Sequence, residues 1–257
     1  MQAPPPAWAL VTGASSGIGA ELARLLAADG NHLVLVARSK DRLEQLAAEL
    51  TQQHRITTRV LPKDLSRPGA AQELFAEVAD IPISTLVNNA GFGRYGNFLE
   101  TNWPATEEMM QVNMVALAEL TRRFAEPMIA RRFGRILNVA SVAAFQPGPT
   151  VSVYYASKAF VYSFSYALAL ELEPFGVTVT TLCPGTTRTA FFERANIHLK
   201  RPYPLMDARV VALAGYRGML KGKRVVIPGW ANWLMARISP CLPSALTASI
   251  VRRIHSA

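Results

Sequence analysis

The sequence has few cysteines and histidines. Its 257 residues include two cysteines, Cys183 and Cys241, and four histidines, all scattered along the chain. Zinc sites and disulfide frameworks place such residues at short, recurring spacings, so neither is expected here. We therefore expect no bound metal and a cytoplasmic protein, because a chain with so few thiols fits a reducing compartment.

Long hydrophobic runs are also missing. No stretch approaches the roughly 18 apolar residues of a membrane span, and residues 1–6 lack the basic and apolar regions of a signal peptide. Half of the residues are nevertheless apolar, which is enough for a large core and argues against disorder. We expect a soluble globular protein.

Acidic residues are scarce toward the carboxyl end. From Lys200 onward there are ten basic residues and one acid, Asp207, so this segment carries the whole net charge of +9. Such asymmetry is typical of a contact with an acidic partner, a membrane surface or nucleic acid, or of a solvated basic face, which we favour. We expect no nucleic-acid binding, because no RNP, zinc-finger or helix-turn-helix signature is present.

Strand-like and helix-like segments alternate along most of the chain. Alternation of this kind predicts an α/β fold of the Rossmann type, a doubly wound parallel sheet of about seven strands with helices on both faces. No linker interrupts it, so we expect a single domain over residues 1–257, with a core at 7–229 and a helical appendage at 230–257. The predicted strands are Trp8–Thr12, His32–Ala37, Ile56–Leu61, Thr85–Asn88, Arg135–Ala140, Val177–Leu182 and Arg224–Pro228.

A glycine-rich turn follows the first predicted strand and opens into a helix. Its glycines permit a sharp turn and close approach to a pyrophosphate, and the helix N-terminus offers N–H groups and a positive dipole. The spacing Gly-x3-Gly-x-Gly differs from the common G-x-G-x-x-G, and a purely structural turn is the alternative. We interpret the turn as a dinucleotide site. The candidate contacts are Gly13, Ser15, Ser16, Gly17, Ile18 and Gly19.

The end of the second predicted strand indicates which dinucleotide binds. About 20 residues after the turn, an acid would bind the ribose 2′-hydroxyl of NAD, whereas an arginine suits the 2′-phosphate of NADP. This sequence has Arg38 there and no acid at Ala37. A surface arginine at a strand end is the alternative. We favour NADP(H) as the cofactor, because a guanidinium offers a planar fork that matches phosphate.

Tyr154 and Lys158 lie four residues apart in Val153–Leu172, a predicted helix, so both face the same side. This pair alone is a common pattern, but further motifs accompany it in a fixed order. Together they resemble the short-chain dehydrogenase/reductase family, in the branch of 3-ketoacyl and hydroxysteroid reductases, over about residues 7–229. The accompanying motifs are Thr12–Gly19, Asn88–Gly91, Ser141 and Pro184-Gly185.

The resemblance implies a catalytic set and further cofactor contacts. Tyr154 would donate a proton to the substrate oxygen, and Lys158 would hold the nicotinamide ribose and lower the pKa of Tyr154. Ser141 would orient the carbonyl, and Asn113 would maintain a water path to the lysine. The other implied cofactor contacts are Asp64, Leu65, Asn89, Ala90, Gly91, Pro184, Gly185, Thr187 and Thr189.

These residue types suit hydride transfer to a carbonyl. Hydride arriving at carbon builds negative charge on oxygen, which must be protonated or stabilised. A free tyrosine, with a pKa of about 10, is a slow proton donor near neutral pH, and a nearby ammonium favours its phenolate. Tyr155 also lies within one turn of Lys158, so helical geometry alone admits either tyrosine; the family spacing selects Tyr154.

The predicted substrate loops are apolar. We therefore expect a bulky apolar ketone or aldehyde as substrate, or the corresponding alcohol in the reverse reaction, although about half of these side chains belong to the core. An inactive NADP(H)-sensing regulator is the alternative function, which the full catalytic set disfavours. The apolar residues are Phe92, Tyr95, Phe98, Val142, Ala144 and Phe145, with Phe191, Phe192, Ile197, Leu199 and Leu205 in a segment at about 189–206 that resembles the family's lid.

The carboxyl-terminal appendage mixes tryptophans with arginines. The resemblance implies a homodimer or homotetramer, and this unusual tail bears on how subunits would meet. We expect it to pack on the body or on a partner subunit, because prolines interrupt any long helix. The alternative is peripheral contact with an anionic membrane. The residues concerned are Trp230, Trp233, Arg237, Arg252 and Arg253.

Overall fold

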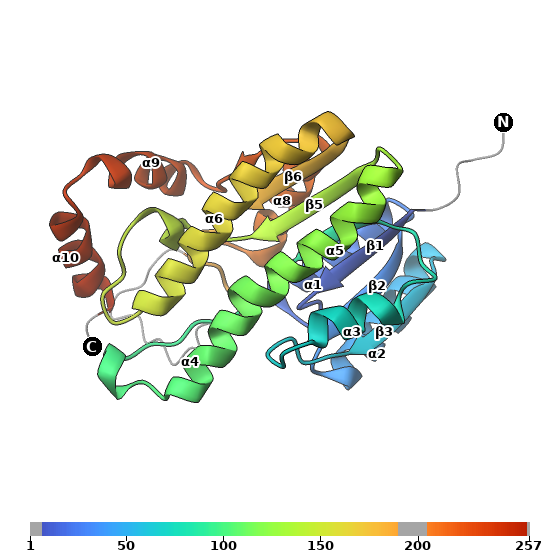
Figure 1. Ribbon diagram of the computed structural model, residues 1–257, viewed down its shortest axis with the longest axis horizontal. Coiled ribbons are helices and arrows are strands. Elements are labelled where there is room, and N and C mark those ends of the chain that lie inside the picture. Colours follow the sequence, from blue (N-terminus) through green and yellow to red (C-terminus); the bar gives the residue numbers. More distant parts are fainter. Residues whose placement is uncertain (1–6, 190–204, 256–257) are drawn as a thin grey trace.

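A computed structural model describes residues 7–189 and 205–255. Seven strands form one sheet in the order β3-β2-β1-β4-β5-β6-β7 (Figure 1), and all neighbours are parallel. This confirms the predicted doubly wound sheet. The strands are β1 (Trp8–Thr12), β2 (His32–Ala37), β3 (Thr58–Pro62), β4 (Ile83–Asn88), β5 (Gly134–Val139), β6 (Val177–Leu182) and β7 (Val225–Val226).

Four strands differ from their predicted bounds. β4 begins at Ile83 rather than Thr85, and β5 spans Gly134–Val139 rather than Arg135–Ala140. β3 begins at Thr58 rather than Ile56, because Thr57 N donates to the ring nitrogen Nδ1 of His32 before the ladder begins. β7 is two residues long instead of the predicted Arg224–Pro228, and it pairs only with the end of β6. A proline has no N–H to donate to a ladder, so the last strand stops short of Pro228.

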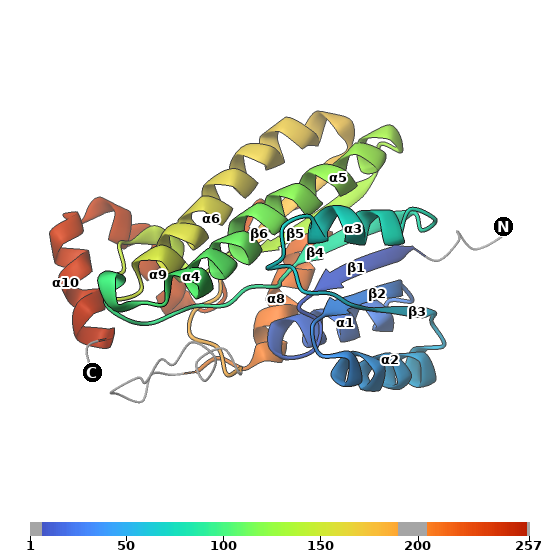
Figure 2. The ribbon, with the colours of Figure 1, turned by 60° about the horizontal axis from the view of Figure 1, so that its bottom comes forward.

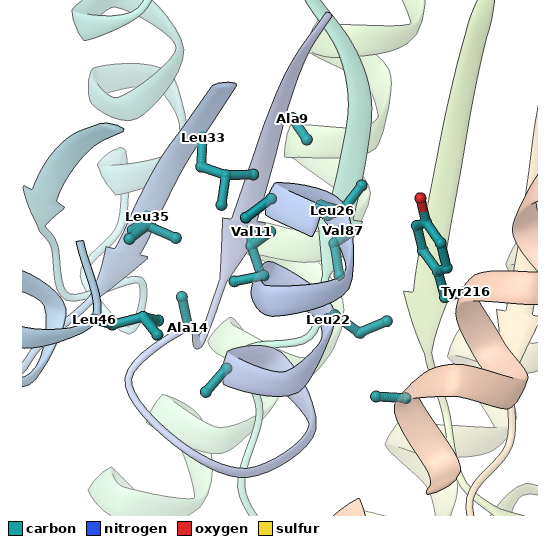
Figure 3. Close-up of a cluster of buried hydrophobic side chains, with 14 of the residues drawn as sticks. Ala9, Val11, Ala14, Leu22, Leu26, Leu33, Leu35, Leu46, Val87 and Tyr216 are labelled. Atoms are coloured by element: carbon teal, nitrogen blue, oxygen red, sulfur yellow. The ribbon is translucent and has the colours of Figure 1, made fainter. Parts of the chain in front are cut away.

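Helices cover both faces of the sheet, and alternate strand residues supply the two cores. Ala9 and Val11 face α1 (Gly17–Ala28), α2 (Lys40–His54) and α8 (Ala208–Leu220), as Figure 3 shows for α1. Leu10 faces α3 (Ala70–Glu77), α5 (Leu117–Ala130) and α6 (Ser152–Leu172) on the other side (Figure 2). Burial on both faces explains why these strands read as continuous apolar runs.

The appendage consists of two helices at the end of the molecule opposite α2 and β3 (Figure 1). They are α9 (Trp230–Ile238) and α10 (Ser244–His255), and Ser239 between them donates a hydrogen bond of 2.9 Å to Gln146 Oε1. Ala236 and Val251 are buried, so one side of the appendage packs on the body. In the described parts of the chain, no helix has both the length and the apolar character needed to cross a membrane.

Candidate active site

A cavity of about 760 Å³ opens at the carboxyl ends of the strands. The strand order reverses between β1 and β4, and such a crossover leaves a crevice in which α/β proteins bind ligands. Most predicted site residues line this one cavity; Gly19 and Asn113 do not. The lining residues are Gly13, Ser15, Ser16, Gly17, Ile18, Arg38, Asp64, Leu65, Asn89, Ala90, Gly91, Ser141, Tyr154, Lys158, Pro184, Gly185, Thr187 and Thr189.

The glycine turn is held against the loop after β4. Asn89 Nδ2 donates to the carbonyl oxygens of Thr12 and Gly13, at 3.0 and 3.1 Å. Gly13 has a φ of 66°, and a Cβ placed there would lie 2.7 Å from Asn89 Nδ2. A Cβ at Gly19 would collide with Gly13 O and Asn89 Nδ2, so Gly19 lies behind the turn and closes it. These glycines therefore allow the turn to pack closely against the loop after β4.

The N-terminus of α1 points into the same part of the cavity. Ser16 is the N-cap residue and makes no side-chain capping bond, and Ser15, Ser16, Gly17 and Ile18 line the cavity. The first N–H groups of a helix need acceptors from outside the helix, and the helix dipole favours an anion there. This geometry fits a bound pyrophosphate.

Two arginines without acidic partners lie beyond the glycine turn. Arg38 and Arg42 both line the cavity, and neither forms an ion pair with any described residue. Lys63, also in the lining, is engaged with Glu73 and Glu77, at 3.2 and 2.6 Å. Arg42 was not predicted from the sequence. Its position one helical turn after Arg38, at the start of α2, is the signal that could have found it.

Tyr154 and Lys158 both lie on α6 and line the cavity, and Lys158 is 5% exposed. The ammonium of Lys158 donates a 3.0 Å hydrogen bond to Val139 O and lies 5.8 Å from the centre of the Tyr154 ring. Burial lowers the pKa of Lys158 to about 8. The ammonium is therefore mostly charged at neutral pH.

The pKa of Tyr154 departs from the expected direction. The resemblance implied that Lys158 would lower it, but burial raises the pKa of Tyr154 to about 12, and a hydrogen bond with Ser141 opposes the rise only in part. Burial penalises the charged phenolate, and that cost exceeds the stabilisation that its neighbours provide. The tyrosine is therefore a neutral hydroxyl at physiological pH in this state of the site.

Ser141 follows β5 and contacts Pro184, which follows β6. It is the N-cap of a short 3-10 helix, η3 (Val142–Phe145), and its Oγ accepts from Ala143 N at 3.1 Å. The same hydroxyl lies 3.4 Å from Pro184 O and is hydrogen-bonded to Tyr154. These contacts hold the serine beside the tyrosine hydroxyl.

Asn113 lies in a π-helical turn, Gln111–Ala116, between α4 (Trp103–Met110) and α5. The side chain is fully buried: Nδ2 donates to Phe92 O and to Ser157 Oγ, and Oδ1 accepts from Phe92 N. A Cβ at Gly91 would lie 2.9 Å from Asn113 Oδ1 and 3.4 Å from Lys158 Nζ. Asn113 is thus next to Lys158 behind the cavity wall, and a glycine between them permits the approach.

The other part of the cavity has apolar side chains in its lining. Of the predicted substrate-loop residues, Phe92 and Val142 line it, whereas Phe145 packs on Tyr162 with ring centres 4.8 Å apart. Tyr95, Phe98 and Ala144 are not in the lining, which fits the expectation that part of this set serves packing. The predicted lid residues Phe191, Phe192, Ile197 and Leu199 lie outside the described residues, and Leu205 is exposed.

Sequence reasoning missed several residues on this side. Met235 of α9 and Val251 of α10 line the cavity, together with the polar residues Arg94, Glu108 and Gln146. No local pattern marks the two appendage residues, because their approach depends on how the appendage folds back. Within the described parts of the chain, no group of three or more His, Cys, Asp or Glu side chains could hold a metal ion.

The chain matches a known family along most of its length. A family model described as short chain dehydrogenase matches residues 7–200. A very-long-chain 3-oxoacyl-CoA reductase of Anas platyrhynchos is 32% identical over 255 residues, which cover 97% of this chain and 80% of that protein.

Solved structures agree with the sequence matches. A short-chain dehydrogenase from Sphingobium yanoikuyae, in complex with NADPH, has 35% identity and a TM-score of 0.84, and 91% of this chain and 93% of that one are covered. The bulky-bulky ketone specific alcohol dehydrogenase from Comamonas testosteroni has 31% identity and a TM-score of 0.81, with 99% and 98% covered.

Proposed function

The chain belongs to the short-chain dehydrogenase family of oxidoreductases, and on that premise we propose that it is an NADPH-dependent reductase of bulky apolar ketones or aldehydes, able to run the reverse alcohol oxidation. The observation that carries the proposal is one shared cavity. Tyr154, Ser141 and Lys158 line it on one side, and the glycine turn and Arg38 line it on the other.

The residues that would hold NADPH follow the cavity wall. The glycine turn and the N-terminus of α1 would bind the pyrophosphate, and Arg38 with Arg42 would bind the 2′-phosphate. When bound, NADPH supplies the hydride, so the protein has to position the carbonyl and handle charge on its oxygen. The remaining predicted contacts would hold the adenine and the nicotinamide half: Asp64, Leu65, Asn89, Ala90, Gly91, Lys158, Pro184, Gly185, Thr187 and Thr189.

Tyr154 would protonate the oxygen of the substrate. With its pKa raised to about 12 by burial, the hydroxyl carries its proton at neutral pH. Negative charge that develops on the carbonyl oxygen needs a proton or a hydrogen-bond donor, and this hydroxyl provides it. Ser141 would orient the oxygen beside it. The charged Lys158 would then stabilise the phenolate that remains until Tyr154 regains a proton.

The apolar lining supports a bulky substrate. Phe92, Val142 and Val151 line the cavity, and Met235 and Val251 of the appendage add further apolar surface. The Comamonas testosteroni relative is described as specific for bulky-bulky ketones, and the Anas platyrhynchos relative reduces very-long-chain 3-oxoacyl-CoA by its name. The first description fits a carbonyl with bulky groups on both sides, and the second fits a carbonyl that bears a long apolar chain on one side.

A panel of ketones and aldehydes tests this function. Purified protein is mixed with NADPH and each carbonyl, and both the loss of NADPH absorbance and the alcohol product are measured. We expect turnover that is fastest with bulky apolar members and slow with sugars. NADPH binding without turnover of any member would favour the inactive NADP(H)-sensing regulator instead.

We also propose a homodimer or homotetramer in the cytoplasm. Helices α5 and α6 lie side by side on one face (Figures 1 and 2), and α6 exposes aromatic and aliphatic side chains there. Phe160 and Phe164 stack with ring centres 5.6 Å apart, and Tyr166 and Leu170 are also exposed. A second copy would cover this surface. Light scattering should give a mass of two or four chains, and a monomer would contradict the proposal.

The appendage has a packed side and an exposed side. Its packed side includes the cavity-lining Val251, and its exposed side carries Trp230, which is 81% exposed, together with Arg237, Arg252 and Arg253. Residues 230–257 contain no acid, so two copies of this surface facing each other would bring arginine against arginine. We propose that the exposed side contacts an anionic membrane surface.

A further inference from the structure

A third arginine in the cavity, Arg94, has no acidic partner among the described residues and no role so far in cofactor binding or catalysis. Arg94 follows the Asn88–Gly91 motif, and its Nε donates a 3.2 Å hydrogen bond to Ala105 O in α4. Within residues 7–189 and 205–255 the guanidinium makes no other hydrogen bond and no ion pair. A guanidinium has five N–H groups, so four of them remain available to a ligand.

The surroundings of Arg94 indicate that its remaining N–H groups need an acceptor. Arg94 is partly buried and lines the cavity beside Phe92 and Val151. A cation that is partly removed from water is costly unless an acceptor or an opposite charge compensates it. A ligand that enters the cavity with an anionic group would supply that compensation.

The charges in the cavity fall into two groups. Arg38, Arg42, Lys63 and Asp64 line the part near β2 and β3, where the 2′-phosphate and adenine are expected. Apart from Lys158, the other charged lining residues among those described are Arg94 and Glu108, from the β4–α4 region. Arg94 therefore comes from a different part of the cavity lining than the residues that would bind the cofactor phosphates.

Glu108 limits what anion fits. Its side chain is exposed and lies beyond the 4.0 Å of an ion pair from Arg94. The Glu108 carboxylate in the lining would repel a dianion such as a phosphate monoester more than a single negative charge. A carboxylate ligand also matches the planar guanidinium with two parallel hydrogen bonds.

We propose that the substrate is an apolar carbonyl compound bearing a carboxylate, and that Arg94 binds this carboxylate and thereby selects the substrate. The inference rests on the proposed reductase function and narrows its substrate class. The apolar body would occupy the space near Phe92, Val142 and Met235, with the carbonyl at Tyr154. Arg94 would act on substrate affinity, and Tyr154 on the rate of the chemical step.

The first experiment compares a bulky keto acid with its own methyl ester. The two share shape and carbonyl chemistry, so their KM ratio reports the carboxylate alone. Wild type should show a KM about 10- to 100-fold lower for the acid, the range expected for one charge-assisted contact. Arg94→Gln should bring the ratio close to one, and Arg94→Lys should give an intermediate ratio. Equal KM values for acid and ester in wild type would overturn the proposal.

Two further variants separate recognition from structural support. Glu108→Gln should lower the KM of the acid by a few-fold, the opposite direction to Arg94→Gln, because it removes a like charge. Arg122 is an exposed residue on α5 that forms an i,i+4 ion pair with Glu126. The control variant Arg122→Gln should leave the KM values of both the acid and the ester unchanged. If Arg94→Gln raises KM equally for acid and ester, Arg94 only fixes the loop to α4, and the proposal is wrong.

A binding measurement keeps this test independent of turnover. A deoxy analogue of the keto acid, which has no carbonyl to reduce, is titrated calorimetrically into the NADPH-loaded protein. Wild type should bind it at least tenfold more tightly than Arg94→Gln does. If neither keto compound is reduced but this difference is present, the reductase function fails and the carboxylate site stands. Equal affinity of the analogue for wild type and Arg94→Gln would contradict the proposed carboxylate site.

Discussion

The two sides of the cavity are built in different ways. On the side of β1–β3 and α1 the wall includes the glycine turn, where a Cβ at Gly13 or Gly19 would collide with Asn89. On the side of α6, α9 and α10 the wall consists of side chains, among them Met235 and Val251. A side chain at Gly13 or Gly19 would displace the loop after β4, whereas Met235 and Val251 can be exchanged for other side chains and so change which substrate fits.

This difference predicts separable effects of mutation. A change on the glycine-turn side should alter cofactor binding for every substrate, and a change on the appendage side should alter substrate choice at constant cofactor affinity. Tyr154 and Lys158 lie where the two sides meet, on one face of α6. Changes there should affect the reaction itself.

The largest effect is expected at that meeting point. Tyr154→Phe removes the proposed proton donor, so kcat should fall by about 10² to 10⁴, the range of general acid catalysis, while NADPH affinity stays the same. Steady-state kinetics and a cofactor titration measure both. Tyr155→Phe is the matched control and should change kcat only slightly, because the Tyr155 ring packs over Gly148. A dead Tyr155→Phe with an active Tyr154→Phe would assign the chemistry to the other tyrosine.

The next effect belongs to the glycine-turn side. Arg38→Ala removes a charge-assisted contact of about 1.5–3 kcal/mol, so NADPH should bind roughly 10- to 150-fold more weakly and NADH almost unchanged. Titration of both cofactors measures this. Lys40→Ala is a suitable control, since Lys40 is also exposed and basic but is not in the cavity lining. Equal affinity of the wild type for NADPH and NADH would disprove the assigned preference.

A smaller effect is expected of pH on the affinity for NADPH. The pKa of Lys158 is lowered by burial to about 8, so its ammonium is mostly present below pH 8 and is lost as pH rises through that value. If the ammonium holds the cofactor, NADPH should bind about tenfold more weakly at pH 9 than at pH 7. Lys158→Met should lose this dependence. A dissociation constant that is flat over this range, or that first changes near pH 10.5, would contradict the lowered pKa.

The smallest effect is expected on the exposed side of the appendage. Full-length protein should float with anionic vesicles at low salt and be released near 1 M salt, where screening is strongest. Arg252→Gln should weaken binding by about fivefold, since one basic residue near such a surface contributes about 1 kcal/mol. Lys223→Gln, exposed but outside the appendage, should have no effect. Protein that stays in solution with anionic vesicles would exclude the membrane contact.

The two sides of the cavity also differ in how well the sequence predicts them. The strands, the glycine turn and the Tyr154–Lys158 pair depend on local spacing. The structure has the turn and the pair on the predicted elements, and each strand within two residues of its predicted bounds. Met235 and Val251 reach the cavity only because the appendage folds back toward η3, a contact between residues about ninety positions apart. Local patterns carry no information about such contacts.

Two features within the core that carries the motifs could also not be predicted from the sequence. The π-helical turn at Gln111–Ala116 depends on Asn113 bonding to the backbone of Phe92, far away in sequence. The raised pKa of Tyr154 depends on the burial that all surrounding elements produce together. The π-helical turn and the raised pKa both depend on tertiary contacts. A sequence motif gives the residue types at a site but not these contacts.

Isotope transfer tests the central claim most directly. The protein is incubated with a bulky ketone and NADPH carrying deuterium at the transferable position of the nicotinamide, and the product is analysed by mass spectrometry. Hydride transfer in this cavity predicts one deuterium on the carbinol carbon of the alcohol product, formed by wild type and almost absent with Tyr154→Phe. An alcohol without the label, or equal labelled product from both proteins, would contradict the account.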